Sequence, residues 1–547
     1  MNTKLAELLF PDITKTPDDM ENMFPPRNLK EGARVTRLAP SPTGFLHFGN
    51  LFTGMVAYKT AKVTDGVFYV RVEDTDQKRK VEGAIEVMLE GLRAFDVIAD
   101  EGVVGEGTEK GDYGPYYQSQ RKEIYHVFAK KLVLEDLAYP CFCSAEALDE
   151  IRAQQENEPQ KGYWGKYAAC RDLSTEEIEK NISEGKPWTL RLKSPGDAEK
   201  KCFFDDMIKG KIEMPENVQD VVLLKSDGIP TYHFAHAVDD HLMRTTHVVR
   251  GDEWMSSCPI HLQLFKCLGF KVPKYAHVAP IMKEENGGKR KLSKRKDPEA
   301  AVTFYVEKGY PKESVNEYIM TLMNSNFEDW RKTNKDADIE SFPFNLKKMS
   351  VSGALFDMVK LNDVSKNIIS LMPAKKVYDY TAQWAKEYDS ELYSLLTRDE
   401  EYSVNILNID RETPKPRKDI ACFSEVKDYI SYFFNEPYEK NYEMPENITP
   451  DMAKEILEAY LKEFNPADDK QQWFDRIKAL CEPLGYTPNV KEYKKNPDAF
   501  KGHVGDVSTV IRIAVTGRKN TPDLYAIMRL LGETTVKERL SDAIKSL

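Results

Sequence analysis

The stretch VTRLAPSPTGFLHFGNLFTGMVAY, residues 35–58, runs from an apolar segment through a loop rich in proline and glycine into a segment of helical character. Residues 33–39 predict a short strand, and residues 51–62 have the length of a helix. His47 and Gly49 stand where that helix begins. Taken alone, the stretch predicts an ordinary strand-to-helix turn, because proline, glycine, serine and threonine occur in most connections.

The segments that follow continue the alternation of strand and helix. GVFYVRVED (66–74) predicts an apolar strand, and residues 81–97 follow as a helix. Strand-like segments return at 221–228 and 246–253, after a more polar region with cysteines at roughly 113–220. Near-continuous apolar strands between helices predict an α/β domain whose parallel sheet is covered on both faces and interrupted by an insertion.

The C-terminal third has helical periodicity. AKEILEAYLKEF (453–464) repeats apolar side chains at helical spacing. TPDLYAIMRLLG (521–532) predicts a helix with Thr521 as N-cap and Gly532 as terminator. The sequence therefore predicts a separate, mostly α-helical C-terminal unit.

Length and composition narrow the class of protein. A chain of 547 residues is too long for one core and predicts three or four domains. No apolar run has the length of a membrane span, and the acidic N-terminus lacks the apolar core of a secretory signal. Eight cysteines in so long a chain do not make a disulfide scaffold, so a reducing cytoplasm is expected.

One basic loop stands out on an acidic chain. The net charge is −11, but phosphate binding requires only a local basic surface. Between Lys283 and Lys296 there are seven lysines and arginines against two glutamates. Such a run is often a solvated loop. Its Gly-Gly entry and spaced lysines also suit a leaving pyrophosphate, on which charge rises in the transition state.

The opening loop has matching chemistry. Ligands of open parallel sheets bind at the carboxyl ends of the strands, and a helix N-terminus there offers free N–H groups to phosphate. A histidine at that place, such as His47, can donate to phosphate oxygens, although a lone histidine there is more often a simple helix cap. Two such elements, far apart in sequence, predict a nucleotidyl-transfer site.

Both loops resemble known signatures. RLAPSPTGFLHFGN resembles the class I aminoacyl-tRNA synthetase motif His-Ile-Gly-His, here HFGN (47–50), and KLSKR (291–295) resembles its partner Lys-Met-Ser-Lys-Ser. PSPTG (40–44) is similar to glutamyl-tRNA synthetases of bacterial type, whereas glutaminyl enzymes usually have Pro-Glu-Pro-Asn-Gly.

Further motifs extend the resemblance from about residue 33 to the C-terminus, with residues 1–30 expected outside it. These motifs are VRVEDTD (70–76), FDDMIKG (204–210) and the stretches 223–243, 246–254, 352–362 and 511–532. The resemblance implies six segments: an N-terminal extension (1–30), the first half of a split Rossmann-like catalytic domain (31–112), an inserted α+β acceptor-end-binding domain (113–222), the second half (223–285), the KLSKR loop with a stem-contact domain (286–375) and a helical anticodon-binding region (376–547).

The family implies a reaction and its partners. The enzyme would activate L-glutamate with ATP to glutamyl-adenylate, release pyrophosphate and transfer glutamate to the 3′ end of tRNA(Glu). Such enzymes usually bind tRNA before they activate glutamate and form no covalent enzyme intermediate. Mg²⁺ would accompany ATP, held mostly by phosphate oxygens. A cytoplasmic monomer is expected, and whether tRNA(Gln) is also charged stays open.

Three other interpretations stand beside this one. A glutaminyl enzyme has an anticodon region built from β-barrels, whereas residues 376–547 have helical periodicity. A glutamyl-queuosine-type relative lacks the C-terminal region. A tRNA-binding protein without catalysis would not need His47, Lys294 and the pocket arginines intact.

The family pattern assigns a glutamate pocket. Arg37 would hold the side-chain carboxylate with Tyr232, Arg250 would face the α-carboxylate and Glu73 would bind the ammonium. Arginine suits this task because its guanidinium binds carboxylate bidentately. Ala39 and Ser41 complete the pocket, together with His236, which stands where many glutamyl enzymes have asparagine. His236 either lines the pocket and donates to the carboxylate or is a packed histidine.

The same pattern assigns the ATP site and the catalytic pair. His47 and Lys294 would act on the phosphates. The ATP-binding set is His47, Gly49, Asn50, Glu253, Trp254, Lys291 and Lys294. Asn50 replaces the second histidine of the motif, so it can still donate a hydrogen bond but carries no charge.

Three cysteines of the inserted region include one close pair, Cys-x-Cys, of the kind found in metal sites. Cys141, Cys143 and Cys170 could hold zinc, with Tyr167 or Asp172 as a fourth partner. Some glutamyl enzymes bind zinc in this domain and others do not. No second close pair of cysteines is present, so buried free thiols are favoured over a zinc site.

Overall fold

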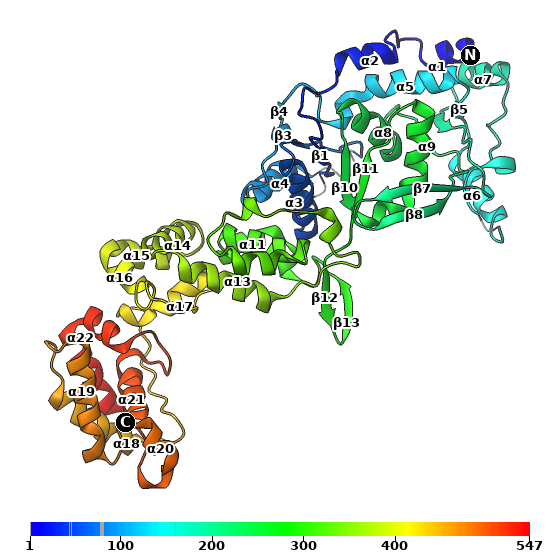
Figure 1. Cartoon of the computed structure of the whole chain (residues 1–547). Helices are drawn as coiled ribbons and strands as arrows, with labels where there is room; N and C mark the ends of the chain where they lie inside the picture. The colour runs from blue at the N-terminus through cyan, green and yellow to red at the C-terminus, as the bar shows by residue number, and fades with distance from the viewer. Residues whose placement is uncertain (1, 43, 45, 77–80, 159) are drawn as a thin grey trace. The chain divides into compact units, whose positions relative to one another are not determined.

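The computed structural model describes residues 2–42, 44, 46–76, 81–158 and 160–547, so Thr43 and Phe45 of the opening loop lie outside the described residues. The chain divides into two compact units, Met1–Phe304 with Asn316–Asp357 and Tyr305–Val315 with Met358–Leu547 (Figure 1). Within the described part of the chain, no helix has the length and apolar character to cross a membrane.

Two sheets form the centre of the first unit. The first has the order β1, β2, β3, β4, in which β1 to β3 run parallel and β4 is antiparallel. The second has the order β10, β11, β7, β8, with a parallel β10–β11–β7 part and an antiparallel edge. Their strands are β1 (Val35–Leu38), β2 (Val67–Val70), β3 (Glu101–Gly105), β4 (Thr108–Lys110), β7 (Lys201–Asp206), β8 (Gly210–Pro215), β10 (His247–Gly251) and β11 (Lys274–Val278).

The two sheets meet at β1 and β10. The backbone N–H of Thr246 donates to the carbonyl of Val35 at 3.0 Å, although the strands are about 200 residues apart in sequence. All four residues of β1 are buried, as expected for a parallel strand covered on both faces. The prediction of a split, Rossmann-like parallel-sheet domain is confirmed.

Helices flank these sheets. Figure 1 shows α8 and α9 beside β10 and β11, and α3 beside β1. The helices are α3 (Phe48–Lys62), α4 (Ala84–Arg93), α5 (Lys122–Leu134), α8 (Tyr232–Leu242) and α9 (Cys258–Leu268). The helix expected at 81–97 is thus shorter than its apolar pattern, because residues at positive φ, Gly83 and Asp96, stand beyond its two ends.

The region expected as an insertion, 113–222, forms a small sheet of its own and also adds two strands to the sheet of β10 and β11. It holds a separate antiparallel sheet of β5 (Ala138–Cys141), β6 (Thr189–Leu192) and β9 (Val222–Leu224), with α6 (Ala145–Gln154) and α7 (Thr175–Ser183). Its strands β7 and β8, however, extend the sheet of β10 and β11 through the pairing of Asp206 with Tyr275. That pairing brings the Asp206 carboxylate to the ring of His277 on β11, with Oδ2 2.7 Å from Nδ1.

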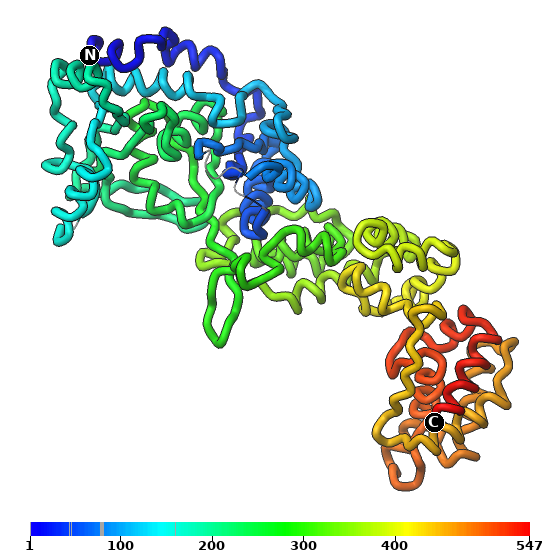
Figure 2. Tube along the Cα trace, turned by 180° about the vertical axis from the view of Figure 1, so that it is seen from behind, coloured from blue at the N-terminus to red at the C-terminus, as the bar shows by residue number. Residues whose placement is uncertain are grey.

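The N-terminal residues belong to the first unit and pack on its helix α5. Helices α1 (Thr3–Leu9) and α2 (Pro17–Met23) lie along α5 in both views of the chain (Figures 1 and 2). Lys130 of α5 donates to the carbonyl of Phe10 at 3.2 Å, and Arg27 pairs with Glu101 at 2.7 Å. The segment is therefore docked by specific contacts.

The remaining elements of the first unit include the hairpin β12 (Met282–Glu285) and β13 (Gly288–Lys291), which ends in the KLSKR loop. Helix α12 (Phe327–Thr333) also belongs to this unit, whereas α10 (Val302–Lys308) and α11 (Lys312–Met323) cross its boundary.

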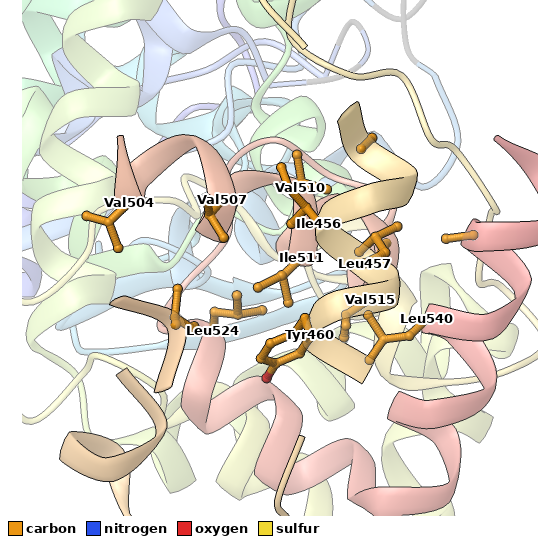
Figure 3. Close-up of a cluster of buried hydrophobic side chains, with 14 of the residues drawn as sticks. Ile456, Leu457, Tyr460, Val504, Val507, Val510, Ile511, Val515, Leu524 and Leu540 are labelled. Atoms are coloured by element: carbon orange, nitrogen blue, oxygen red, sulfur yellow. The ribbon is translucent and has the colours of Figure 1, made fainter. Parts of the chain in front are cut away.

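The second unit is helical, as predicted. Its helices are α13 (Met358–Leu371), α14 (Ala374–Tyr388), α15 (Ser390–Arg398), α16 (Glu400–Leu407), α17 (Val426–Ile430), α18 (Pro450–Glu463), α19 (Lys470–Cys481), α20 (Val490–Lys495), α21 (Val504–Thr516) and α22 (Leu524–Ser546). Figure 3 shows Ile456, Leu457 and Tyr460 of α18 packed against apolar side chains of α21 and α22. These are apolar positions of the 453–464 pattern.

Helix α22 differs from its prediction at both ends. Its N-cap is Asp523, whose carboxylate accepts from the N–H of Ala526 at 2.9 Å, so the expected cap at Thr521 is wrong. Thr521 Oγ1 instead donates to the carbonyl of Pro522. Gly532 does interrupt the helix, with φ +81°, but helical backbone resumes after it and continues to Ser546.

Candidate active site

A cavity of about 350 Å³ opens where the parallel strands of the first unit end. It is bordered by the residues after β1, β2, β10 and β11 and by the N-termini of α3 and α8. Its lining includes Arg37, Ala39, Ser41, His47, Gly49, Asn50, Glu73, Tyr232, Arg250, Glu253, Trp254 and Lys291. Of the glutamate and ATP residues expected from the sequence, His236 and Lys294 are the two that do not line it.

His47 caps helix α3. Its Nδ1 accepts the backbone N–H of Gly49 at 2.9 Å, which leaves the ring proton on Nε2. An added Cβ at Gly49 would lie 3.1 Å from that Nδ1, so glycine gives the ring its room. Burial and the charges of Lys294 and Lys291 lower the pKa of His47, against a hydrogen bond with the backbone of Leu292. The HFGN and KLSKR motifs therefore meet at His47.

Arg37 is a buried, paired cation. Its Nε lies 3.1 and 3.2 Å from the two carboxylate oxygens of Asp240, and its Nη1 donates to the carbonyl of Val249 at 3.2 Å. Burial would lower the pKa of Arg37, but Asp240 raises it. The guanidinium is thus held on two sides at the cavity wall.

Glu73 faces the same cavity and is held by Arg71, whose Nη2 donates to its Oε1 at 3.1 Å. Arg71 in turn donates to Asp240 at 2.8 Å. Burial raises the pKa of Glu73, against the charges of Arg71 and Arg37. An ammonium group beside Glu73 would favour its ionised form.

Tyr232 and Trp254 form an aromatic corner beside Arg250. Their ring centroids lie 4.2 Å apart, and Arg250 Nη1 donates to the Tyr232 hydroxyl at 3.3 Å. Trp254 is 37% exposed, which leaves its ring available to a ligand. An aromatic face next to a cation suits the stacking of a base above a bound carboxylate.

His236 lies behind the wall of the cavity and is fully buried. Its ring is parallel to that of Tyr232, with centroids 5.9 Å apart. Its Nδ1 lies 2.7 Å from Asp240 and its Nε2 3.1 Å from the Tyr275 hydroxyl. Burial lowers the pKa of His236 to about 3, so the ring is neutral at physiological pH. His236 therefore contacts Asp240, the carboxylate that holds Arg37, and does not line the cavity.

The basic loop is anchored by an acid. Asp297 accepts two bonds from Arg290, at 2.6 and 2.8 Å, one from Lys283 at 3.0 Å and one from the N–H of Ser293 at 2.9 Å. Lys294 borders a second space of about 80 Å³ on the other side of Ser41 and Asn50. Part of the positive charge counted in the sequence is thus paired at the base of the loop.

Several residues that shape the site were not expected from the sequence. Asp240 supports Arg37, His277 and His261 contact Arg250, and Asp206 contacts His277. Asp206 and Asp240 stand in stretches quoted for the resemblance, but only contacts across the fold reveal their partners.

The three cysteines of the inserted region come together. Their Sγ atoms lie within 4.8 Å of one another, and those of Cys143 and Cys170 are 3.6 Å apart. The Tyr163 hydroxyl lies 3.3 Å from Cys143 Sγ, whereas Tyr167 binds Glu158. Tyr163, which was not expected from the sequence, thus contacts the cysteine cluster, whereas the expected fourth partner Tyr167 contacts Glu158.

Comparisons with known proteins agree with this geometry. A family model described as tRNA synthetases class I (E and Q), catalytic domain, matches residues 34–363, and one described as anticodon binding domain matches residues 491–544. Glutamate–tRNA ligases of Clostridium perfringens (strain 13) and Acetivibrio thermocellus are each 52% identical to this chain, over 541 and 539 residues, which is 98% of this chain and 99% and 98% of theirs. A solved glutamate tRNA ligase from Elizabethkingia meningosepticum, in complex with its amino acid, is 27% identical with a TM-score of 0.75, over 94% of this chain and 100% of that one.

The same alignments include most of the N-terminal segment. They leave 2% of 547 residues, about 11, outside. The expectation that residues 1–30 lie outside the resemblance is therefore wrong for most of that segment.

Proposed function

The chain belongs to the class I tRNA synthetases for glutamate and glutamine, and we propose that its cavity activates L-glutamate with ATP for transfer to tRNA(Glu). It is a glutamate–tRNA ligase, as the 52% identity to such enzymes over nearly the whole chain supports. The helical second unit argues against a glutaminyl enzyme.

The observation that carries the assignment of the cavity is the meeting of two arginines and one glutamate at three strand ends. Glutamate brings two carboxylates and one ammonium, and Arg37, Arg250 and Glu73 offer the opposite charges around one space. We assign Arg37 with Tyr232 to the side-chain carboxylate, Arg250 to the α-carboxylate and Glu73 to the ammonium. Ala39 and Ser41 line the remaining wall.

We place ATP on the other side of the cavity. The N-terminus of α3 with His47, Gly49 and Asn50 would receive its phosphates, and Glu253 and Trp254 would lie near the adenosine. Lys291 and Lys294 would stabilise the pyrophosphate as its charge develops, which requires Lys294 to turn toward the main cavity. Mg²⁺ would be held mostly by phosphate oxygens.

The chemistry needs no covalent bond to the protein. A carboxylate oxygen of glutamate attacks the α-phosphorus, the bond to the β-phosphate oxygen breaks and pyrophosphate leaves. The terminal hydroxyl of tRNA then attacks the activated carbonyl carbon and AMP leaves. His47 would turn the proton on Nε2 from the Leu292 backbone to a phosphate oxygen as a hydrogen-bond donor.

ATP–pyrophosphate exchange tests this proposal. We expect exchange with L-glutamate when tRNA is present, much less without tRNA, and none with L-glutamine. His47→Ala should lower the rate about 10²- to 10³-fold, as for loss of one transition-state donor. Absence of exchange with and without tRNA would overturn the assignment.

Partners and location beyond this are also proposals. We propose a cytoplasmic location, which is supported by eight cysteines that form no disulfide. We also propose that the protein is a monomer. Size-exclusion chromatography with light scattering tests the monomer. Charging of purified tRNA(Glu) and tRNA(Gln) side by side decides whether the second is also a substrate.

The cysteine spacing alone favoured buried free thiols, but because the three Sγ atoms lie together we also propose that Cys141, Cys143 and Cys170 hold zinc. The Sγ atoms are close enough for one tetrahedral ion with bonds of about 2.3 Å, and the Tyr163 hydroxyl is placed to complete the set. We expect about one zinc per chain by atomic emission, and three more reactive thiols after chelation. Cys143→Ser should lose the metal, whereas Cys202→Ser should keep it.

A further inference from the structure

Arg250 is a buried cation whose neighbours are neutral. It is 5% exposed, and its nitrogens lie within hydrogen-bond distance of His277, His261, the Tyr232 hydroxyl, the Trp254 carbonyl and the Cys258 thiol. Among the described residues, no carboxylate lies within ion-pair distance of it. Burial of an unpaired charge costs free energy, so an anionic group of a bound ligand would stabilise this cation.

The protons around Arg250 follow from its chemistry. A guanidinium only donates, so His277 Nε2, 3.0 Å from Arg250 Nε, must accept with its lone pair. The ring proton is then on Nδ1, which lies 2.7 Å from Asp206 Oδ2. The carboxylate of Asp206 therefore selects the tautomer that His277 needs.

Asp206 is itself fixed by the backbone. Its Oδ1 accepts the N–H groups of Ile208 and Lys209 at 2.9 Å each, and its Oδ2 accepts the N–H of His277 at 3.0 Å. These bonds and that of the His277 ring lower the pKa of Asp206 against the effect of burial. Asp206 is therefore an ionised carboxylate, held by backbone N–H groups, at the far end of the contacts from Arg250 through His277 to Asp206.

A second histidine braces the other side of the guanidinium. His261 Nδ1 lies 3.2 Å from Arg250 Nη1 and must also accept, so its proton is on Nε2, 3.0 Å from His233 Nδ1. Two neutral rings from different elements thus hold Arg250 without cancelling its charge. This differs from Arg37, which Asp240 neutralises.

We propose that His277, oriented by Asp206, is a positioning residue that sets the Arg250 guanidinium for the α-carboxylate of glutamate. This rests on the proposed role of Arg250 in substrate binding. His277 does not line the cavity, so it acts through Arg250. A neutral acceptor is required at its Nε2, because a carboxylate there would pair with Arg250 and compete with the substrate.

Two amide substitutions separate the ring's two nitrogens. In His277→Gln the side-chain oxygen reaches about as far as Nε2 and can accept from Arg250, whereas in His277→Asn the shorter amide reaches only the place of Nδ1. We expect the glutamate KM in ATP–pyrophosphate exchange with tRNA to rise roughly 10- to 100-fold in His277→Asn, the range for one hydrogen bond to a charged group. His277→Gln should recover most of that loss.

The controls separate positioning from folding. His247→Gln changes another buried histidine, on Arg250's own strand, whose Nδ1 lies 2.9 Å from the Thr246 hydroxyl. Among the described residues it forms no hydrogen bond with Arg250, so this variant should leave the KM for glutamate and the KM for ATP unchanged. The ATP KM and the urea unfolding midpoint of His277→Asn should stay close to wild type. A fall of kcat, ATP affinity and unfolding midpoint together would show a structural role only and overturn the proposal.

Arg250→Gln separates this proposal from the assignment beneath it. If Arg250→Gln raises the glutamate KM and His277→Asn does not, positioning by His277 is wrong and the role of Arg250 stands. If Arg250→Gln leaves the glutamate KM unaltered, the assignment of Arg250 fails and the proposal fails with it.

Discussion

The two cavity arginines differ in what surrounds their charge. Arg37 is held by the carboxylate of Asp240, while neutral side chains and a carbonyl surround Arg250. Both pairings place a guanidinium in a fixed orientation before substrate arrives, which reduces the ordering cost of binding. The charge of Arg37 is largely balanced by Asp240, so Arg37 mainly contributes oriented N–H donors. Arg250 contributes oriented N–H donors and an unbalanced positive charge.

Arg37→Gln should raise the glutamate KM about 100-fold or more. The change removes a bidentate donor and leaves the Asp240 carboxylate facing the substrate's carboxylate with Arg71 as its remaining cation. Steady-state exchange with glutamate varied at saturating ATP measures it. An unaltered glutamate KM would place Arg37 outside the binding pocket.

At the scale of elements, the KLSKR loop is a hairpin end with a fixed base. Asp297 closes it by accepting from Arg290, Lys283 and the backbone of Ser293. The side chain of Asp297 is 1% exposed, so these bonds are shielded from solvent. Such an anchor fixes the base of the loop whose lysines we assign to the phosphates.

Asp297→Asn should slow glutamate activation about tenfold with little change in glutamate KM, because we assign the loop's lysines to the developing pyrophosphate rather than to glutamate. Lys294→Ala should slow it further. Single-turnover formation of the adenylate, measured at several glutamate concentrations, separates the rate of activation from the binding of glutamate. A rate equal to wild type in Lys294→Ala would refute its role at the pyrophosphate.

The start of α22 offers a second test at this scale. Asp523→Ala should lower the free energy of unfolding by about 0.5–2 kcal/mol, the usual cost of losing an N-cap. Thr521→Val leaves that cap in place and should cost less. Urea unfolding of the full chain measures both, and an equal or larger effect of Thr521→Val would contradict the capping role of Asp523.

Across the whole molecule, ionisable histidines are gathered in one unit. The chain has nine, and His503 alone belongs to the second unit. In the first unit, burial lowers the pKa of His233 and of His247 to about 4, and it lowers the pKa of the others as well. No comparable set of histidines is present in the second unit.

The first unit should therefore lose stability in mild acid while the second does not. A histidine whose pKa falls from 6.5 to about 4 on folding binds its proton less in the folded chain, so stability is complete above pH 6.5 and declines as pH falls toward 4. Each fully buried histidine contributes up to about 1.4 kcal/mol per pH unit. Pulse proteolysis in urea at pH 7.5 and 5.5, read by fragments of each unit, measures the difference. Equal shifts in both units would contradict it.

The sequence by itself determined the alternation of strands and helices, the helical C-terminal unit and the two loops that meet at His47. The resemblance of its motifs to glutamyl-tRNA synthetases also implied which arginines and which glutamate share a cavity. These features are encoded locally, in periodicity, turns and short motifs.

Only the tertiary structure decided which groups hold those residues. Arg37 and Asp240 are 203 residues apart, and Arg250 meets His277 on another strand. It moved His236 behind the wall and transferred the cap of α22 to Asp523. The physical reason is that tautomers, ion pairs and buried charges depend on neighbours brought together by packing, and no local pattern records them.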